Sequence, residues 1–184
     1  MNSVWMMLAV AMTTASAEGP GGACGASADV RPDSVDVWLA STRRLSCDAC
    51  SEPSAPDFWQ LSAGGDWIEA DQRAFLKSDR ATIPTVFYIH GNRYGMDDAV
   101  QYGLNFCEEL KGLEPDAKFR FVIWSWPADR ITRRNRPDLV VKHFRSQQES
   151  VYVARLIDRL HAEVPVSLVG HSYGAQTICG TVRL

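Results

Sequence analysis

The sequence predicts a single α/β domain in which a mostly parallel sheet is covered by helices on both faces. Short runs rich in β-branched and aromatic residues, with little polar alternation, are typical of strands buried on both sides. Three such runs are 85–89 (TVFYI), 119–124 (FRFVIW) and 166–169 (VSLV). Two amphipathic patterns, about 97–111 and 145–163, separate them. This alternation predicts right-handed βαβ crossovers and a three-layer α/β/α sandwich.

The chain before these runs is less regular. Residues 35–39 (VDVWL) predict a first strand, 58–61 (FWQL) a weaker second strand, and 71–77 a short helix or turn. The segment 46–56 is rich in Pro, Ser and Cys and reads as a loop. The chain has 184 residues, which is enough for one core of ordinary size and too few for two.

Composition places the chain among soluble globular proteins, with 46% hydrophobic and 22% charged residues. The net charge of −3 provides no long-range attraction to nucleic acid or to an anionic membrane. No apolar run reaches the roughly 18 residues that a membrane span needs. We therefore expect no nucleic-acid partner and no membrane span.

The N-terminal residues have the pattern of an export signal. An apolar run, 4–12, precedes the small-x-small tripeptide 15–17 (ASA), which suits cleavage after Ala17. The first three residues carry no Lys or Arg, so a buried N-terminal helix or a misassigned start codon are the alternatives. Export would be periplasmic or extracellular (secreted), and otherwise the protein is cytoplasmic. The expected division is 1–17 signal peptide, 18–34 flexible leader and 35–184 folded domain.

Five cysteines are distributed unevenly. Cys24, Cys47 and Cys50 either form a structural disulfide, in a pairing that stays open, or are plain thiols. A zinc site would need a second ligand pair, which the sequence lacks, so no metal is expected. Cys107 and Cys179 fall in apolar helical patterns and are expected as small buried hydrophobes.

The most specific motif is Gly170-x-Ser172-x-Gly174, which follows the strand 166–169 and leads into a helical start. Because the chain must reverse from strand to helix within a few residues, Ser172 is expected at positive φ. The two glycines would approach the neighbouring strand too closely for any side chain. The helix N-terminus beside Ser172 would favour developing negative charge.

A second loop, His90-Gly91-Asn92, ends an earlier strand. Acyl transfer needs two backbone N–H donors aimed at the oxyanion, one just after the nucleophile and one from another loop. Tyr173 would supply the first and Asn92 the second. Gly91 is expected to let the loop turn over the sheet edge, and His90 to orient that loop through hydrogen bonds.

Three segments, TVFYIHGNRYGMDDA, FVIWSWPADR and VSLVGHSYGAQ, resemble the α/β-hydrolase superfamily. They are most similar to a bacterial group of hydrolases with an HG-Y/N loop, an SWPS-like strand end and a GHS-x-G elbow. The resemblance covers about 84–184. It implies an α/β-hydrolase type of sandwich, Ser172 as nucleophile, Asn92 and Tyr173 as oxyanion donors, an ester, thioester or amide as small-molecule acyl substrate, and no metal or organic cofactor.

In that family the acid and base follow later strands, which are absent here. None of the four histidines is expected to replace the base. His171 is expected as a packing residue and His161 as a solvated residue late in the second helix. His143 would lie in the connection after Trp124 and could approach the cleft.

Charged residues near the expected site can be explained by structural roles without a part in catalysis. Asp97 and Asp98 open a helix, where carboxylates cap free N–H groups. Asp129 either shapes the pocket or is solvated. A basic cluster is either solvated surface or a cap region that attracts anionic substrates; it comprises Arg130, Arg133, Arg134 and Arg136.

No stop signal follows the last apolar residue of the final helix before Leu184. We therefore expect the N-terminal portion of a longer carboxylic-ester hydrolase, truncated after the nucleophile helix and inactive alone for lack of acid and base. Its last strand would leave a sheet edge open to self-association. The alternative is a noncatalytic α/β-hydrolase-like binding or scaffold protein that kept the elbow for packing.

Overall fold

A computed structural model describes residues 35–45, 55–132 and 135–184. Its strands are β1 (Val35–Ser41), β2 (Asp57–Leu61), β3 (Trp67–Ala70), β4 (Thr85–Ile89), β5 (Phe119–Ser125) and β6 (Val166–Gly170). Its helices are α1 (Gln72–Lys77), α2 (Met96–Leu113), α3 (Asn135–Ile157) and α4 (Tyr173–Thr181). The expected signal peptide and leader, together with Cys24, Cys47 and Cys50, lie outside the described residues.

The strands form one six-stranded sheet in the order β3-β2-β1-β5-β4-β6. The pairs β1–β5, β5–β4 and β4–β6 are parallel, whereas β2 and β3 add an antiparallel extension beside β1. This confirms the mixed α/β fold with a mostly parallel sheet. The hairpin partner β3 was not expected, because its four residues, WIEA, carry too little β-branched character to be recognised.

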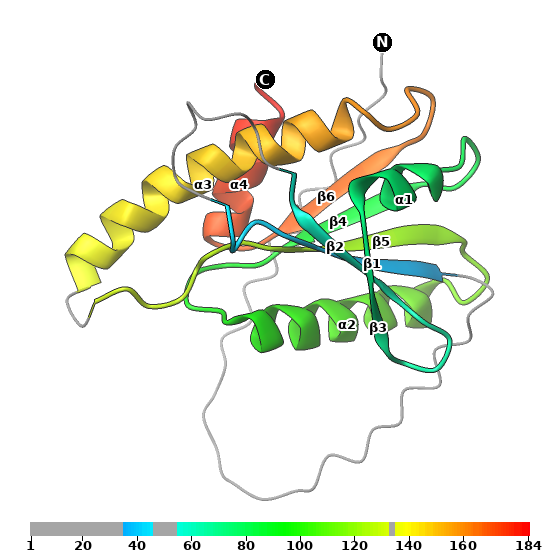
Figure 1. The fold of residues 1–184 in the computed structure, drawn as a ribbon, viewed down its shortest axis with the longest axis horizontal. Helices are drawn as coiled ribbons and strands as arrows, with labels where there is room; N and C mark the ends of the chain where they lie inside the picture. Colours follow the sequence, from blue (N-terminus) through cyan, green and yellow to red (C-terminus); the bar gives the residue numbers. More distant parts are fainter. Residues whose placement is uncertain (1–34, 46–54, 133–134) are drawn as a thin grey trace, which may run out of the picture.

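The order of the strands places the helices in two layers. The chain moves from β4 to β5 through α2 and then returns past β4 to β6 through α3. With the right-handed crossover that βαβ units adopt, this change of direction puts α2 and α3 on opposite faces of the sheet. Figure 1 shows α2 alone below the sheet and α1, α3 and α4 above it.

Each face of the sheet has its own core. Alternate residues of β5 supply both, with Val122 and Trp124 facing α3 and α4 and with Phe121 and Ile123 facing α2. All four are 0% exposed. Because both faces of the strand are covered, β5 reads as an unbroken apolar run.

The cysteines on the helices divide between core and surface. Cys107 is buried in the α2 core, as expected, and burial raises the pKa of its thiol to about 12. Cys179 is exposed, which corrects the sequence-based expectation. The buried face of α4 is formed by Gly174, Thr177, Ile178 and Thr181, so Cys179 points away from the sheet.

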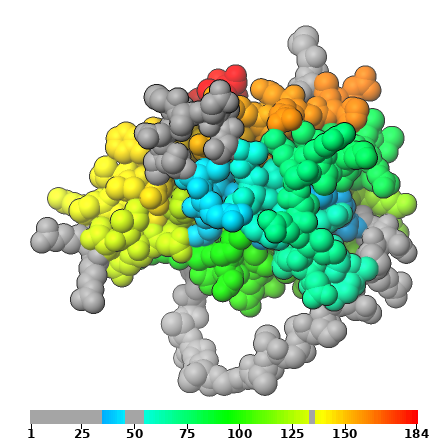
Figure 2. Space-filling view, in the orientation of Figure 1, coloured from blue at the N-terminus to red at the C-terminus, as the bar shows by residue number. Residues whose placement is uncertain are grey.

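The second long helix begins and ends earlier than its apolar pattern indicated. It was expected at 145–163, and α3 runs from Asn135 to Ile157. His143 is therefore in the helix and not in a connection. His161 is exposed and lies in the turn after the helix, where its backbone N–H donates to Asp79 Oδ2 at 2.6 Å. The first half of α3 extends past the end of the sheet and forms the yellow bulge in Figure 2.

Within the described ranges, no helix is both long and apolar enough to cross a membrane.

Candidate active site

The turn between β6 and α4 has the strained geometry that its sequence predicted. Ser172 is the N-cap residue of α4, with φ 55° and ψ −122°, and it is exposed. Such a conformation costs a residue with a Cβ about 1–3 kcal/mol and persists only where the surrounding structure enforces it. The predicted positive φ of Ser172 is confirmed.

Two glycines enforce this turn by packing against β4. A Cβ on Gly174 would lie 2.0 Å from the carbonyl oxygen of Ile89, and one on Gly170 would lie 2.8 Å from that oxygen. Neither position has room for a side chain, as predicted. The elbow therefore lies directly on the last residue of β4, immediately before the His90 loop.

His90 is a buried, neutral residue that organises this loop. It is 0% exposed, and burial lowers its pKa to about 3. Its Nε2 is 3.2 Å from the backbone N–H of Trp126 and must accept that hydrogen bond, so the proton is on Nδ1, which donates to Gly91 O at 2.8 Å. The Trp126 indole donates in return to His90 O at 2.9 Å. The expectation that His90 orients its loop through hydrogen bonds is confirmed.

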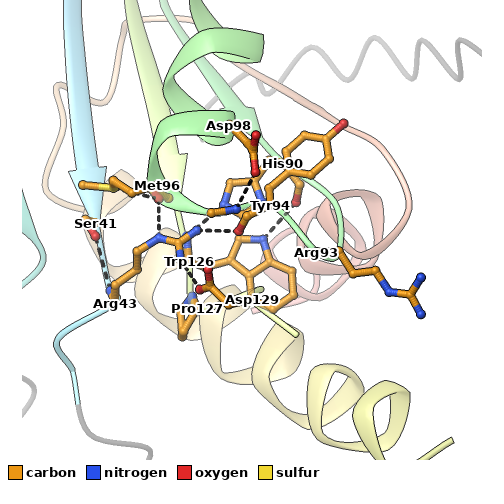
Figure 3. Close-up of polar contacts among 12 residues, drawn as sticks. Ser41, Arg43, His90, Arg93, Tyr94, Met96, Asp98, Trp126, Pro127 and Asp129 are labelled. Atoms are coloured by element: carbon orange, nitrogen blue, oxygen red, sulfur yellow. Dashed lines mark hydrogen bonds and ion pairs between the residues drawn. The ribbon is translucent and has the colours of Figure 1, made fainter. Parts of the chain in front are cut away.

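An aromatic stack joins this loop to the elbow. The His90 ring lies between Tyr94 and Trp126, with centroid separations of 5.5 and 5.6 Å. Tyr173, the residue after Ser172, meets the Trp126 ring edge-on at 6.4 Å. Figure 3 shows Trp126 and Tyr94 around His90. The loop and the elbow therefore share one rigid packing unit.

At Gly91 the space for a side chain is limited by a neighbouring ring, and the expectation that Gly91 lets the loop turn over the sheet edge stays a prediction. The only glycine with positive φ among the described residues is Gly65, so Gly91 needs no special backbone conformation. A Cβ at Gly91 would instead lie 2.6 Å from Nε2 of His171, whose ring also packs against Tyr94 at 5.6 Å. Burial lowers the pKa of His171. His171 is nevertheless an exposed residue, and the packing contact that the structure gives it is the one with Tyr94.

The two expected oxyanion donors belong to the first residue of α4 and to the turn after β4. Tyr173 begins α4, where the first backbone N–H groups have no partner within the helix. Asn92 is half-buried in the turn after β4, and its Oδ1 accepts from the N–H of Arg93 at 2.9 Å. Arg93 itself has φ 66°, a second strained residue at this end of the sheet.

An arginine that the sequence did not single out ties three segments together at the carboxyl ends of the strands. Arg43, just after β1, donates through Nε to Ser125 Oγ and through Nη2 to Tyr94 O, both at 2.8 Å. Its Nη1 pairs with Asp129 (Figure 3). Asp129 is 59% exposed and paired, so it supports the loop from its outer side. In the sequence, Arg43 and Arg44 simply follow a strand, and no local pattern predicts that one of them joins three segments.

Behind this arginine, α3 directs charged side chains inward. Lys142 is 0% exposed and donates through Nζ to the carbonyl oxygens of Pro127 and Asp129; burial lowers its pKa to about 8. The Glu149 carboxylate accepts from Thr42 Oγ1 at 2.8 Å and Trp124 Nε1 at 2.9 Å. Burial raises the pKa of Glu149 to about 7. No periodic pattern predicted either residue.

The structure brings His143 beside the elbow helix but not onto the serine. Its Nδ1 lies 2.6 Å from the side-chain nitrogen of Gln176 in α4, and its Nε2 lies 3.2 Å from that of Gln147. In the described part of the chain, none of the four histidines hydrogen-bonds to the Ser172 hydroxyl. The acids at the start of α2 act as expected at a helix N-terminus, because Asp98 Oδ2 accepts from the N–H of Gly95 at 3.0 Å.

Comparisons of the chain with models of known protein families, with curated proteins and with solved structures find no match. The case for a function therefore depends on the geometry of the elbow and its neighbouring loop.

Proposed function

We propose that this chain carries the nucleophile and oxyanion half of a serine hydrolase of α/β-hydrolase type, which acts on an ester, thioester or amide. The observation that carries the proposal is Ser172, held at positive φ between a buried strand and a helix N-terminus by two glycines without room for a side chain. A residue in this conformation must be enforced by its surroundings, and such strain is concentrated at functional sites. The aromatic packing around His90 supports it by anchoring the second loop beside the serine.

In the proposed reaction, Ser172 Oγ forms a bond to the acyl carbon as its proton passes to a base. The negative charge that develops on the carbonyl oxygen is stabilised by the backbone N–H groups of Asn92 and Tyr173 and by the N-terminus of α4. The leaving group departs with a proton, and water then releases the acid. None of the histidines hydrogen-bonds to the Ser172 hydroxyl in the described residues, so we expect negligible turnover by this chain alone.

A second candidate is a noncatalytic binding or scaffold protein with the same elbow. It is favoured by one observation, the engagement of His90, His143 and His171 with partners other than Ser172. In that case the serine would be held by packing alone.

The two candidate functions predict different effects of a soluble base, imidazole, on the labelling of Ser172. We expect a fluorophosphonate probe to label Ser172 slowly, and faster when imidazole is added in place of the absent base, as read by mass spectrometry of the modified peptide. Ser172→Ala should remove that adduct. The control is Ser167→Ala, which changes a serine five residues earlier on β6 and should keep the adduct. Absence of any Ser172 adduct with imidazole, in a folded protein, would favour the noncatalytic candidate.

A further inference from the structure

From Asp138 to Glu149, α3 directs polar side chains toward the protein, while its exposed side over residues 139–144 is mostly apolar. Those that face the protein are Asp138, Lys142, Ser146 and Glu149, each at most 4% exposed. Those that face outward are Leu139 (40% exposed), Val140 (56%), Val141 (39%) and Phe144 (61%). With Ile131 (50% exposed), we refer to these outward residues as the α3 apolar face.

This orientation of the helix is held by the inward groups. Lys142 donates to two carbonyl oxygens, and Glu149 accepts from a hydroxyl and an indole. Asp138 Oδ1 accepts from the backbone N–H of Ile131 at 2.9 Å. Rotating α3 to bury its apolar side chains would break these bonds, and a buried polar group left without a partner is unfavourable. The exposure is therefore built into the fold.

The α3 apolar face borders the elbow. The hydroxyl of Tyr173 donates to the carbonyl oxygen of Leu139 at 3.1 Å, and His143 contacts Gln176 on α4. Figures 1 and 2 show this end of α3 projecting beyond the sheet. A surface that received this face would lie beside Ser172.

The charge around the α3 apolar face is positive, although the whole chain carries −3. In the sequence, the segment from Asp129 to Arg145 has six basic and two acidic residues. Lys142 and Arg145 donate to the backbone carbonyl oxygen of Pro127, so the exposed cations that the structure describes in this segment are Arg130 and Arg136. Asp129 pairs with Arg43, whereas Asp138 accepts from the N–H of Ile131 and keeps its negative charge. Exposed cations at the rim include Arg93, Arg130 and Arg136. Arg93 and Arg130 lie close enough to Asp138 to help lower the pKa of its carboxyl, after the Ile131 hydrogen bond.

We propose that the α3 apolar face docks onto an anionic phospholipid surface, with its arginine rim against the headgroups. An amphipathic helix binds such an interface through buried apolar area together with attraction of basic residues to anionic lipid. The attraction acts within a Debye length of about 8 Å, so the local positive charge decides it and the net charge of the chain does not. A symmetric contact between two copies would instead bring two arginine rims together.

The test is flotation of the whole chain with vesicles of phosphatidylglycerol, compared with vesicles of phosphatidylcholine. We expect binding to phosphatidylglycerol, weakened by added salt. The double variant Val140→Glu/Phe144→Glu should lower the affinity about tenfold or more, because two apolar side chains that would be buried in the interface are replaced by charged ones. Arg136→Glu should weaken binding less and reduce its dependence on salt.

Matched controls are Ile68→Glu and Leu113→Glu, which place the same charge at apolar residues that are 57% and 77% exposed elsewhere. They should bind like the wild type, and circular dichroism verifies that all variants are folded. Equal binding by the double variant, or no binding by the folded wild type, overturns the proposal. So does an oligomer without lipid that the double variant dissociates, because the face would then be a protein interface. Ser172→Ala should bind lipid normally, so the result is separate from that for hydrolysis.

Discussion

At Ser172 the backbone adopts a conformation that few residues with a Cβ tolerate. The glycines two residues before and two residues after it enforce this conformation by packing against β4. Gly170 and Gly174 bring the elbow against the carbonyl oxygen of Ile89. The strain of one residue is thus balanced by close packing of its neighbours. We therefore expect a substitution that disrupts this packing to lower the free energy of unfolding.

Gly174→Ala should lower the free energy of unfolding by about 3 kcal/mol or more, because its Cβ would lie 2.0 Å from Ile89 O and the strand end or the elbow must move. Urea unfolding measures the change. Gly112→Ala is the matched control, since nothing lies within 4 Å of its Cβ and alanine favours helix by up to about 1 kcal/mol. A Gly174→Ala variant within about 0.5 kcal/mol of the wild type would contradict a closely packed elbow.

At the scale of the element, α3 shows how a helix can be held by polar contacts and not by an apolar stripe. Near its C-terminal end it packs Val153 and Leu156 into the core, whereas earlier in the helix Lys142 and Glu149 point toward the ends of β1 and β5. Buried ionisable groups of this kind make stability depend on pH.

Glu149 should make the free energy of unfolding fall as pH rises from about 4.5 to about 7, since burial raises its pKa in the folded protein from the ordinary 4.5 to about 7. In that window the folded state holds a proton that the unfolded state has lost, and the effect is at most about 3 kcal/mol. Glu149→Gln keeps an acceptor for Trp124 and Thr42 but cannot ionise. Its stability relative to the wild type should therefore increase between pH 5 and pH 8 in urea unfolding.

Exposed Glu163→Gln serves as the control for Glu149→Gln and should show no such trend. A difference between Glu149→Gln and the wild type that stays constant with pH would mean that Glu149 is ionised in the folded protein throughout.

For the whole molecule, the open edges of the sheet matter most. β6 pairs with β4 on one side and, in the described chain, with no strand on the other. An uncovered edge offers unpaired N–H and C=O groups to another copy. The self-association expected from the sequence stays a prediction.

Sedimentation velocity should show association that grows with protein concentration, and Ser167→Lys should reduce it by placing a charge on the half-buried side of β6. Ala63→Lys, which adds the same charge in the exposed β2–β3 turn, should leave association unchanged. If Val140→Glu/Phe144→Glu dissociates the wild-type oligomer and Ser167→Lys does not, the edge is not the contact.

Local patterns were enough for the features that depend on neighbouring residues. The strands at 85–89, 119–124 and 166–169 were recognised because residues buried on both faces read as apolar runs. The elbow was recognised because the steric limits of a strand-to-helix reversal act within five residues, from Gly170 to Gly174. For the same reason the positive φ of Ser172 was predictable without any tertiary contact.

Contacts between distant segments decided the rest. Arg43 reaches Ser125 and Tyr94 across the sheet, Gly91 is limited by the ring of His171, and Lys142 is buried by the carbonyl oxygens of the β5 end. Each depends on partners brought together only by the strand order. The α3 apolar face is the clearest case, because periodicity places apolar residues inside unless tertiary hydrogen bonds turn the polar side inward.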